Sequence, residues 1–570
     1  MVELFTFPAA PGPKATEWPG TPIGTGNAIT EAKSPTAVRD NVIDRIEGRR
    51  DELVSAGVEH VVRRAGTGPV WIRDAIIHGV RVRLITDSPH LQEFWTANWY
   101  DPEGWRSLTE LTPPYAPRIV VYALSGVADQ PEAVYYSRRT DTIILFNTSY
   151  YDQLRGSVLG AVGHVLAEDY GIHTLRGACA AQRGRGVLYL GPTGIGKSTL
   201  AYGFLSRGAD ARVYSDDWVH VRYTLAMRDG RRIVPFEIRP TNGRVMRGHR
   251  VYRWLEEHRG ASGQVRGLDL GSAEIEVPVA ALDLAKPIEA YAYPAEKASY
   301  ARTGLIAGVP RLAAGLLRAR FENVPDVAPE RLDTRAAELD NLADAVLRAA
   351  ADAGEGAPWT VESELGASRD DVRRWLARLT AFDGARAILD VAASPLAGHV
   401  VTHPMEGIPV SALMLVRHDP LDRTILQALP VETFVARVLI GRAADGACEI
   451  AYNPDRAVDT AAERAAVERL EADVTPSDQG GQSFYREFRR QPAVPETLAQ
   501  EFEFLRLLHQ AARCYDLNAI LALDPNVRDL PEAVARTAAL TVYMMETSDR
   551  SARASLDDYR KILTAVAPPP

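Results

Sequence analysis

Residues 186–218 read GVLYLGPTGIGKSTLAYGFLSRGADARVYSDDW, and this stretch decides the fold. The run from Gly191 to Ser198 matches the complete pattern of glycine, four residues, glycine, lysine and serine that cradles phosphates. Residues 186–190 before it predict a short buried strand, and residues 198–207 after it predict a helix that Gly208 ends. A strand, a glycine-rich loop and a helix in this order predict a phosphate-binding loop.

The residue types of this loop suit a nucleotide. Its glycines let backbone N–H groups converge on phosphate oxygens at the start of a helix. Lys197 can neutralise the β- and γ-phosphates, and the Ser198 hydroxyl can ligate Mg²⁺. We therefore expect ATP or GTP, with Mg²⁺, as cofactors. The predicted nucleotide-binding residues are Gly191, Thr193, Gly194, Ile195, Gly196, Lys197, Ser198 and Thr199.

An acidic pair follows the helix of the loop directly. Residues 211–215 (ARVYS) predict a short strand that ends in Asp216 and Asp217. In most P-loop ATPases one or more further strand and helix units come before the acidic strand, so this short spacing is distinctive. Adjacent side chains at the end of a strand point in different directions, so one carboxylate can hold Mg²⁺ while the other accepts a proton from a substrate hydroxyl. The spacing favours phosphoryl transfer.

The wider stretch 171–219 resembles the bacterial HPr kinase/phosphorylase family. A strand that carries His173 precedes the loop, the acidic pair follows it, and residues 236–239 (FEIR) are similar to the Glu-Ile-Arg signature of that family. The same nucleotide fold occurs in phosphoenolpyruvate carboxykinases. The residues after Arg239 (PTNGRVMRGHR) depart from the glycine-rich continuation of HPr kinases. The resemblance implies a kinase core of the HPr kinase and carboxykinase type.

The resemblance also implies roles for individual residues. Asp216 would be the base that accepts the hydroxyl proton, and His173 would pair with it. Asp217 and Ser198 would hold Mg²⁺. A hydroxyl on a protein serine or on a small-molecule alcohol would be the phosphoryl acceptor.

Two residues of the FEIR run complete the set of candidates. Glu237 and Arg239 alternate along an apparent strand and therefore share one face, where they would form an ion pair or approach the phosphates. We count Arg239 as a catalytic candidate together with Asp216, His173 and Lys197. Glu237 is a third candidate ligand of Mg²⁺.

Composition limits the partners of the chain. The 570 residues are 46% hydrophobic and 24% charged, which is ample for packed cores, and the net charge is −9. An acidic chain gives no global attraction for nucleic acid or for an anionic membrane. The three cysteines form no disulfide framework, and no run approaches the roughly 20 apolar residues that span a bilayer. We expect a cytoplasmic protein that binds neither nucleic acid nor membrane.

The order of patterns predicts an α/β protein (mixed α+β) whose P-loop core carries additions. Strands are expected at 71–84 (broken at His78 and Gly79), 119–124, 142–146 and 410–417. A helix is expected with Pro89 in its first turn and with Asp87 or Ser88 as its cap. The predicted parts are a flexible leader (1–40), an N-terminal α+β domain (41–150), the nucleotide-binding kinase core (151–287), a mostly helical insertion (288–400), strands that complete the core (401–475) and a C-terminal helical region (485–570).

These observations favour an ATP-dependent kinase that transfers the γ-phosphoryl group to a hydroxyl. One alternative is a carboxykinase-like lyase or another ATP-consuming enzyme, since that fold is shared. Another is a nucleotide-sensing module that regulates without turnover. The intact Lys197, Ser198 and acidic pair favour the kinase, because a sensor has no need for a candidate base.

Overall fold

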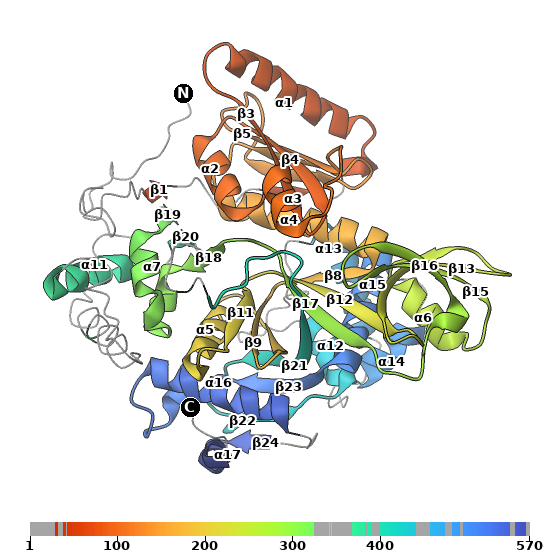
Figure 1. The fold of residues 1–570 in the computed structure, drawn as a ribbon. Helices are drawn as coiled ribbons and strands as arrows, with labels where there is room; N and C mark the ends of the chain where they lie inside the picture. The colour runs from red at the N-terminus through yellow and green to blue at the C-terminus, as the bar shows by residue number, and fades with distance from the viewer. Residues whose placement is uncertain are drawn as a thin grey trace. The chain divides into compact units, whose positions relative to one another are not determined.

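The computed structural model describes residues 29–31, 38–40, 43–323, 341, 344, 368–381, 385–389, 396, 398–440, 456–472, 482–490, 494–547 and 553–565. These residues form a mixed α/β protein whose sheets combine parallel and antiparallel strands (Figure 1). The chain divides into two units. Unit 1 comprises residues 1–158, 296–403 and 528–535, and unit 2 comprises residues 159–295, 404–527 and 536–570.

Unit 1 contains a six-stranded sheet in the order β2-β6-β7-β5-β4-β3. Strands β4, β5 and β7 are parallel, and β3 and β4 form a hairpin. The hairpin turns at His78 and Gly79, whose φ angles of 47° and 89° are both positive. The strands are β2 (Val38–Asp40), β3 (Trp71–Ile77), β4 (Val80–Thr86), β5 (Ile119–Leu124), β6 (Ala133–Ser137) and β7 (Thr142–Phe146).

Three helices of unit 1 accompany this sheet. Ser88 caps the second of them by accepting a hydrogen bond from the Leu91 N–H at 3.3 Å, and Asp101 caps the third by accepting from the Gly104 N–H at 2.7 Å. Proline occupies the first turn of both helices, where its missing N–H would have had no acceptor within the helix. The helices are α1 (Arg49–Ala65), α2 (Pro89–Asn98) and α3 (Pro102–Thr109), preceded by the 3₁₀ turn Ile43–Arg45.

A four-stranded sheet, in the order β1-β19-β20-β18, also belongs to unit 1. The buried Glu322 of β19 accepts the backbone N–H of Tyr151 at 2.6 Å and pairs with His90 at 2.8 Å. A carboxylate therefore satisfies an N–H at the start of helix α4. The elements are β1 (Ile29–Glu31), β18 (Ser299–Arg302), β19 (Arg320–Asn323), β20 (Arg386–Leu389), α7 (Ala313–Arg318) and α11 (Arg369–Ala381).

Unit 2 is built on a fourteen-stranded sheet whose main path is β11-β9-β10-β21-β17-β12-β13-β15-β16. Strands β10, β21 and β23 are parallel to one another. The strands are β8 (Ile172–Leu175), β9 (Gly177–Gln182), β10 (Arg185–Leu190), β11 (Arg212–Ser215), β12 (Val219–Ala226), β13 (Arg232–Pro240), β14 (Met246–Arg247), β15 (Gly263–Asp269), β16 (Glu274–Pro278), β17 (Glu289–Pro294), β21 (Ile408–Arg417), β22 (Thr424–Ala428), β23 (Arg513–Asn518) and β24 (Arg553–Ser555).

Helices cover this sheet. Helix α5 contacts β9 and β10, while α15 contacts β12, β17, β21 and β23. Both α4 and α16 cross the boundary between the units along the chain. The helices are α4 (Tyr151–Tyr170), α5 (Lys197–Gly203) with the 3₁₀ turn Phe204–Arg207, α6 (Arg250–Glu257), α12 (Val431–Ile440), α13 (Thr460–Ala472), α14 (Gln482–Arg490), α15 (Glu496–Ala511), α16 (Leu530–Glu546) and α17 (Tyr559–Ala565).

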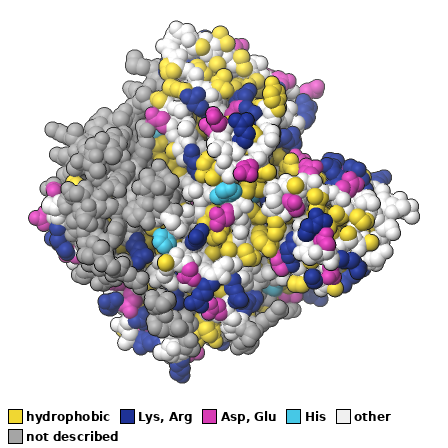
Figure 2. Space-filling model, viewed as in Figure 1, with side chains coloured by type: hydrophobic (Ala, Val, Ile, Leu, Met, Phe, Trp, Pro, Cys, Tyr) yellow, Lys and Arg dark blue, Asp and Glu magenta, His cyan; other side chains and the backbone are white. Residues whose placement is uncertain are grey.

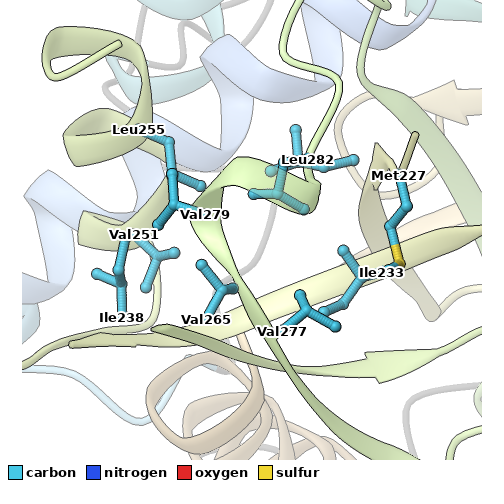
Figure 3. Close-up of a cluster of buried hydrophobic side chains, with 10 residues drawn as sticks. Met227, Ile233, Ile238, Val251, Leu255, Val265, Val277, Val279 and Leu282 are labelled. Atoms are coloured by element: carbon cyan, nitrogen blue, oxygen red, sulfur yellow. The ribbon is translucent and has the colours of Figure 1, made fainter. Parts of the chain in front are cut away.

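Strands β13, β15 and β16 share a core with helix α6. Figure 3 shows their apolar side chains converging from these strands, the helix and the segment 279–282. Ile238 and Val265 are fully buried there, on paired strands, opposite Val251 of α6. Alternating apolar positions on the strands and the apolar stripe of one short helix account for this packing.

The charged surface is mixed in sign. Over β13, β15 and β16, on the right of the face in Figure 2, basic and acidic side chains lie next to one another. Such interspersion gives that face no single-sign field. Among the helices that the structure describes, none combines the length and apolar character needed to cross a bilayer.

Most of the predicted elements form. The strand pattern at 71–84, broken at His78 and Gly79, forms a hairpin, and Ser88 is the one of the two candidate caps that starts α2. The strands 119–124 and 142–146 are confirmed, as are the strand, loop and helix around Gly191. The mixed α/β class is confirmed as well. These elements carry local signals, namely alternation, turn residues and capping residues, and their packing agrees with those signals.

Several expectations differ from the structure. The leader predicted at 1–40 contributes β1 and β2, so its described residues pair with sheets instead of standing apart. The apolar run Phe434 to Ile440, included among core strands, forms helix α12, and the C-terminal helical region supplies β23 to the sheet. Among its described residues the insertion 288–400 includes four strands, β17 to β20, while much of its predicted helical part lies outside the described residues.

Val265→Ala tests the core drawn in Figure 3. It removes two buried methyl groups from a position with 0% exposure, so we expect unit 2 to lose about 2 kcal/mol of stability. The measurement is the midpoint of urea unfolding followed by tryptophan fluorescence. Val245→Ala is the matched control, since Val245 is 53% exposed and its truncation should change stability by less than about 0.5 kcal/mol. Equal losses in both variants would contradict the assignment.

Candidate functional site

The phosphate-binding loop lies between β10 and α5. A Cβ on Gly191 would lie 2.8 Å from the carbonyl oxygen of Val416 on the neighbouring strand β21, so only glycine fits there. Gly196, at the start of α5, has a φ angle of 101°, which residues other than glycine rarely adopt. The tip of the loop, at Thr193 and Gly194, is exposed to solvent. The backbone thus has the turn that the motif requires.

The side chain of Lys197 is hydrogen-bonded to the first residues of this loop. Its ammonium group donates hydrogen bonds to the carbonyl oxygens of Gly191 at 2.8 Å and Pro192 at 2.9 Å, and its side chain is largely buried. Ser198 follows in the first turn of α5 and is half-buried. The ammonium donors and the serine hydroxyl are therefore both positioned at the loop.

The acidic pair lies at the same edge of the sheet as the loop. Strands β10 and β11 both run antiparallel to β9, so they point in the same direction and end at one edge. Gly177 of β9 is paired with Leu190, and its N–H donates to the carbonyl of Asp217 at 3.0 Å. One strand separates β10 from β11, which corresponds to about 10 Å between them. Asp216 and Asp217 therefore follow a strand end that is level with the start of the loop.

Arg176 fixes one member of the pair. Its Nε donates to Oδ1 of Asp217 at 3.1 Å, and both side chains are mostly buried. Asp217 has a φ angle of 69°, so its backbone turns sharply just after the strand. A charge-assisted hydrogen bond of this kind restricts the carboxylate. Sequence reasoning missed Arg176, although it stands within the stretch that carries the family resemblance.

His173 lies in a different network. Its Nδ1 is 2.9 Å from the Tyr223 hydroxyl, its Nε2 is 3.1 Å from Oε1 of Glu501, and its ring stacks on Phe504. Both ring nitrogens are thus engaged, and the expected pairing of His173 with Asp216 is wrong. Glu501 lies on the distant helix α15, and no local sequence signal connects it with His173.

The network around His173 is buried and charged. Arg456 approaches Oε2 of Glu501 at 3.5 Å and also donates to Glu463 at 3.0 Å. His173, Arg456 and Glu501 line a cavity of about 40 Å³, and none of its lining residues belongs to the phosphate loop. A volume of this size suits a few water molecules. This cluster stabilises the packing of α15.

Glu237 and Arg239 form an ion pair within a cluster of arginines. The nearly buried Glu237 carboxylate lies 2.8 Å from Arg239, 2.8 Å from Arg247 and 3.5 Å from Arg266. Burial raises the pKa of Glu237, but the hydrogen bond from Arg247 and the three guanidinium charges outweigh it, so the pKa lies below its ordinary value. Three guanidinium groups neutralise this carboxylate, which argues for the structural ion pair and against a metal ligand.

Oxygen donors near the loop suit Mg²⁺. Ser198 and the two aspartates supply a hydroxyl and carboxylates, which are the ligands this ion prefers, together with phosphate oxygens and water. Among the residues that the structure describes, no group of three or more His, Cys, Asp or Glu side chains could hold a metal. A Mg²⁺ site shared with a nucleotide fits this arrangement, because such sites use only one or two carboxylates.

Comparisons with known proteins add no family. Neither the protein-family models nor the curated proteins gave a match to this chain. The loop, the acidic pair and their shared edge of the sheet are therefore the features that bear on its function.

Glu501→Gln tests the buried network. Burial raises the pKa of Glu501, but the charges of His173 and Arg456 and the hydrogen bond with His173 lower it overall, from 4.5 to about 2. The ionised carboxylate therefore stabilises the fold fully above pH 4.5, and this contribution is lost as the pH falls toward 2. We expect the variant to lose about 3 kcal/mol at pH 7 and the difference from wild type to shrink below pH 4.5.

Unfolding by urea at several pH values measures this difference. Glu468→Gln is the control, because Glu468 is exposed on α13 and its change should cost less than about 0.5 kcal/mol at every pH. A loss for Glu501→Gln that stays constant down to pH 2.5 would show that the carboxylate is not the stabilising group.

Proposed function

We propose that this chain is an ATP-dependent phosphotransferase that moves the γ-phosphoryl group to a hydroxyl acceptor. The observation that carries the proposal is the register of β9 with β10 and β11, which brings the acidic pair to the edge of the sheet where the phosphate loop begins. A nucleotide-binding loop alone serves many activities. A carboxylate base beside it is what a transfer to a hydroxyl requires.

In this proposal the loop and Lys197 bind the phosphates. The ammonium group exchanges the carbonyls of Gly191 and Pro192 for phosphate oxygens, and the backbone N–H groups of the loop add further donors. Ser198 and Asp217 hold Mg²⁺, which when bound neutralises charge on the β- and γ-phosphates. Arg176 keeps the Asp217 carboxylate in place through their 3.1 Å contact.

Asp216 acts as the base. Its carboxylate accepts the proton of the acceptor hydroxyl as the acceptor oxygen forms a bond to the γ-phosphorus. The bond between that phosphorus and the oxygen bridging to the β-phosphate breaks, and ADP leaves with the electron pair. Positioning and charge stabilisation supply most of the catalysis in such transfers.

Asp216→Asn and Lys197→Ala separate the two roles. We expect Asp216→Asn to keep nucleotide affinity and to lower kcat by a factor on the order of 10²–10⁴, because only the proton acceptor is lost. Lys197→Ala should also weaken nucleotide binding, by about tenfold or more, because a charge-assisted contact to phosphate is lost. Fluorescent nucleotide titration measures affinity, and phosphate transfer measures kcat.

Asp229→Asn is the control for the carboxylate change. It lies exposed in the turn between β12 and β13, paired with Arg231, and should leave both affinity and kcat unchanged. Phosphoryl transfer that persists in Asp216→Asn would show that Asp216 is not the base. Unchanged nucleotide affinity in Lys197→Ala would show that the phosphate loop does not bind the nucleotide.

The acceptor can be found with γ-labelled ATP and a cell extract. After incubation, protein and small-molecule fractions are separated, with Lys197→Ala as the parallel blank. Label in protein identifies a protein hydroxyl, and label in small molecules identifies a metabolite alcohol. Release of inorganic phosphate alone would contradict phosphotransfer and favour a nucleotide-dependent switch.

A further inference from the structure

A large cavity lies at the opposite edge of the unit 2 sheet from the phosphate loop. It has a volume of about 530 Å³ and is lined by the starts of β10, β17, β21 and β23, the end of α15 and Met545. The loop follows the carboxyl end of β10, whereas this cavity contains Arg185 at the amino end of the same strand. Ligand sites commonly have volumes of about 300–1,000 Å³.

Two arginines of this cavity converge on the end of a helix. Arg185 donates to the carbonyl oxygen of Met545 at 3.3 Å, and Arg513 donates to the carbonyl oxygens of Met545 and Thr547. These carbonyls end helix α16, whose dipole offers about half a negative charge. Within the described part of the chain, neither guanidinium forms an ion pair with a carboxylate. Two full positive charges therefore face only partial negative ones.

The other polar groups of the cavity do not neutralise this charge. Glu289 forms an ion pair with Arg232. The Nε2 of His509 contacts the Leu429 carbonyl at 2.9 Å and must donate to it, while burial lowers the pKa of His509, so the ring is neutral at pH 7. Burial also raises the pKa of the Cys514 thiol, which leaves it protonated and unreactive. The cavity therefore has two cationic groups that can bind an anion.

We propose that this cavity binds a small anion through Arg185 and Arg513. The ligand carries a carboxylate or phosphate group, which guanidinium donors recognise well because their geometry matches its oxygens. Val410, Leu429 and Met545 offer apolar contacts to the rest of the molecule. Neither the loop nor the acidic pair takes part in this site, so it stands whether or not the chain transfers phosphate.

Titration calorimetry on the full chain tests this site. Inorganic phosphate, succinate and neutral succinamide are the probes, and all proteins carry Lys197→Ala so that phosphate binding at the loop is suppressed. We expect phosphate or succinate to bind and succinamide not to bind. Phosphate alone would identify a phosphate ligand, and succinate alone would identify a carboxylate ligand.

Variants locate the binding. Adding Arg185→Gln should weaken anion binding by about tenfold, while Arg185→Lys, which keeps the charge but loses the guanidinium geometry, should weaken it less. Arg183→Gln is the matched control, since Arg183 is 61% exposed in the turn before β10 and lies outside the cavity. The proposal is overturned if no anion binds, if succinamide binds equally well, or if Arg183→Gln and Arg185→Gln weaken binding to the same extent.

Discussion

Strand β9 hydrogen-bonds to β10 on one side and to β11 on the other, and this double pairing sets the candidate site. Because β9 is antiparallel to both neighbours, the loop after β10 and the acidic pair after β11 emerge at one edge. A shift of one residue in either ladder would reverse the faces of the side chains on the shifted strand. Fully buried residues along β9 and β10 make such a shift costly.

The parts of the fold that depend on local chemistry could be predicted from the sequence. The glycines of the loop and the cap before Pro89 each have a direct physical requirement and form as expected, with Ser88 as the cap. The break expected at His78 and Gly79 is a turn with positive φ angles. The apolar run at 434–440 was placed among the strands expected at 401–475, but it forms helix α12, which packs against α14 and α15. A short apolar run alone does not separate a buried strand from a helix. Strand β23 escaped prediction because its partner β21 is distant in the sequence.

Pairings between distant carboxylates and bases were out of reach of sequence reasoning. Glu501 with His173, and Glu322 with His90, join residues that no motif connects. His173 suited a catalytic role by its position before the loop, yet its two nitrogens serve Tyr223 and Glu501. Spacing along one chain segment indicates which strands can meet. The pairing of side chains across the fold depends on helices from later in the sequence that pack against these strands, as α15 does.

The close packing of Gly191 against Val416 of β21 has a consequence for the folding of the chain during its synthesis. Strands β9, β10 and β11 come from one continuous stretch of chain and can pair early, but β10 keeps an open hydrogen-bonding edge until β21 has been synthesised. An open, apolar edge is a template for pairing with other chains. A nascent chain that has not yet released residues 408–417 from the ribosome therefore exposes this edge of β10 to pairing with other chains.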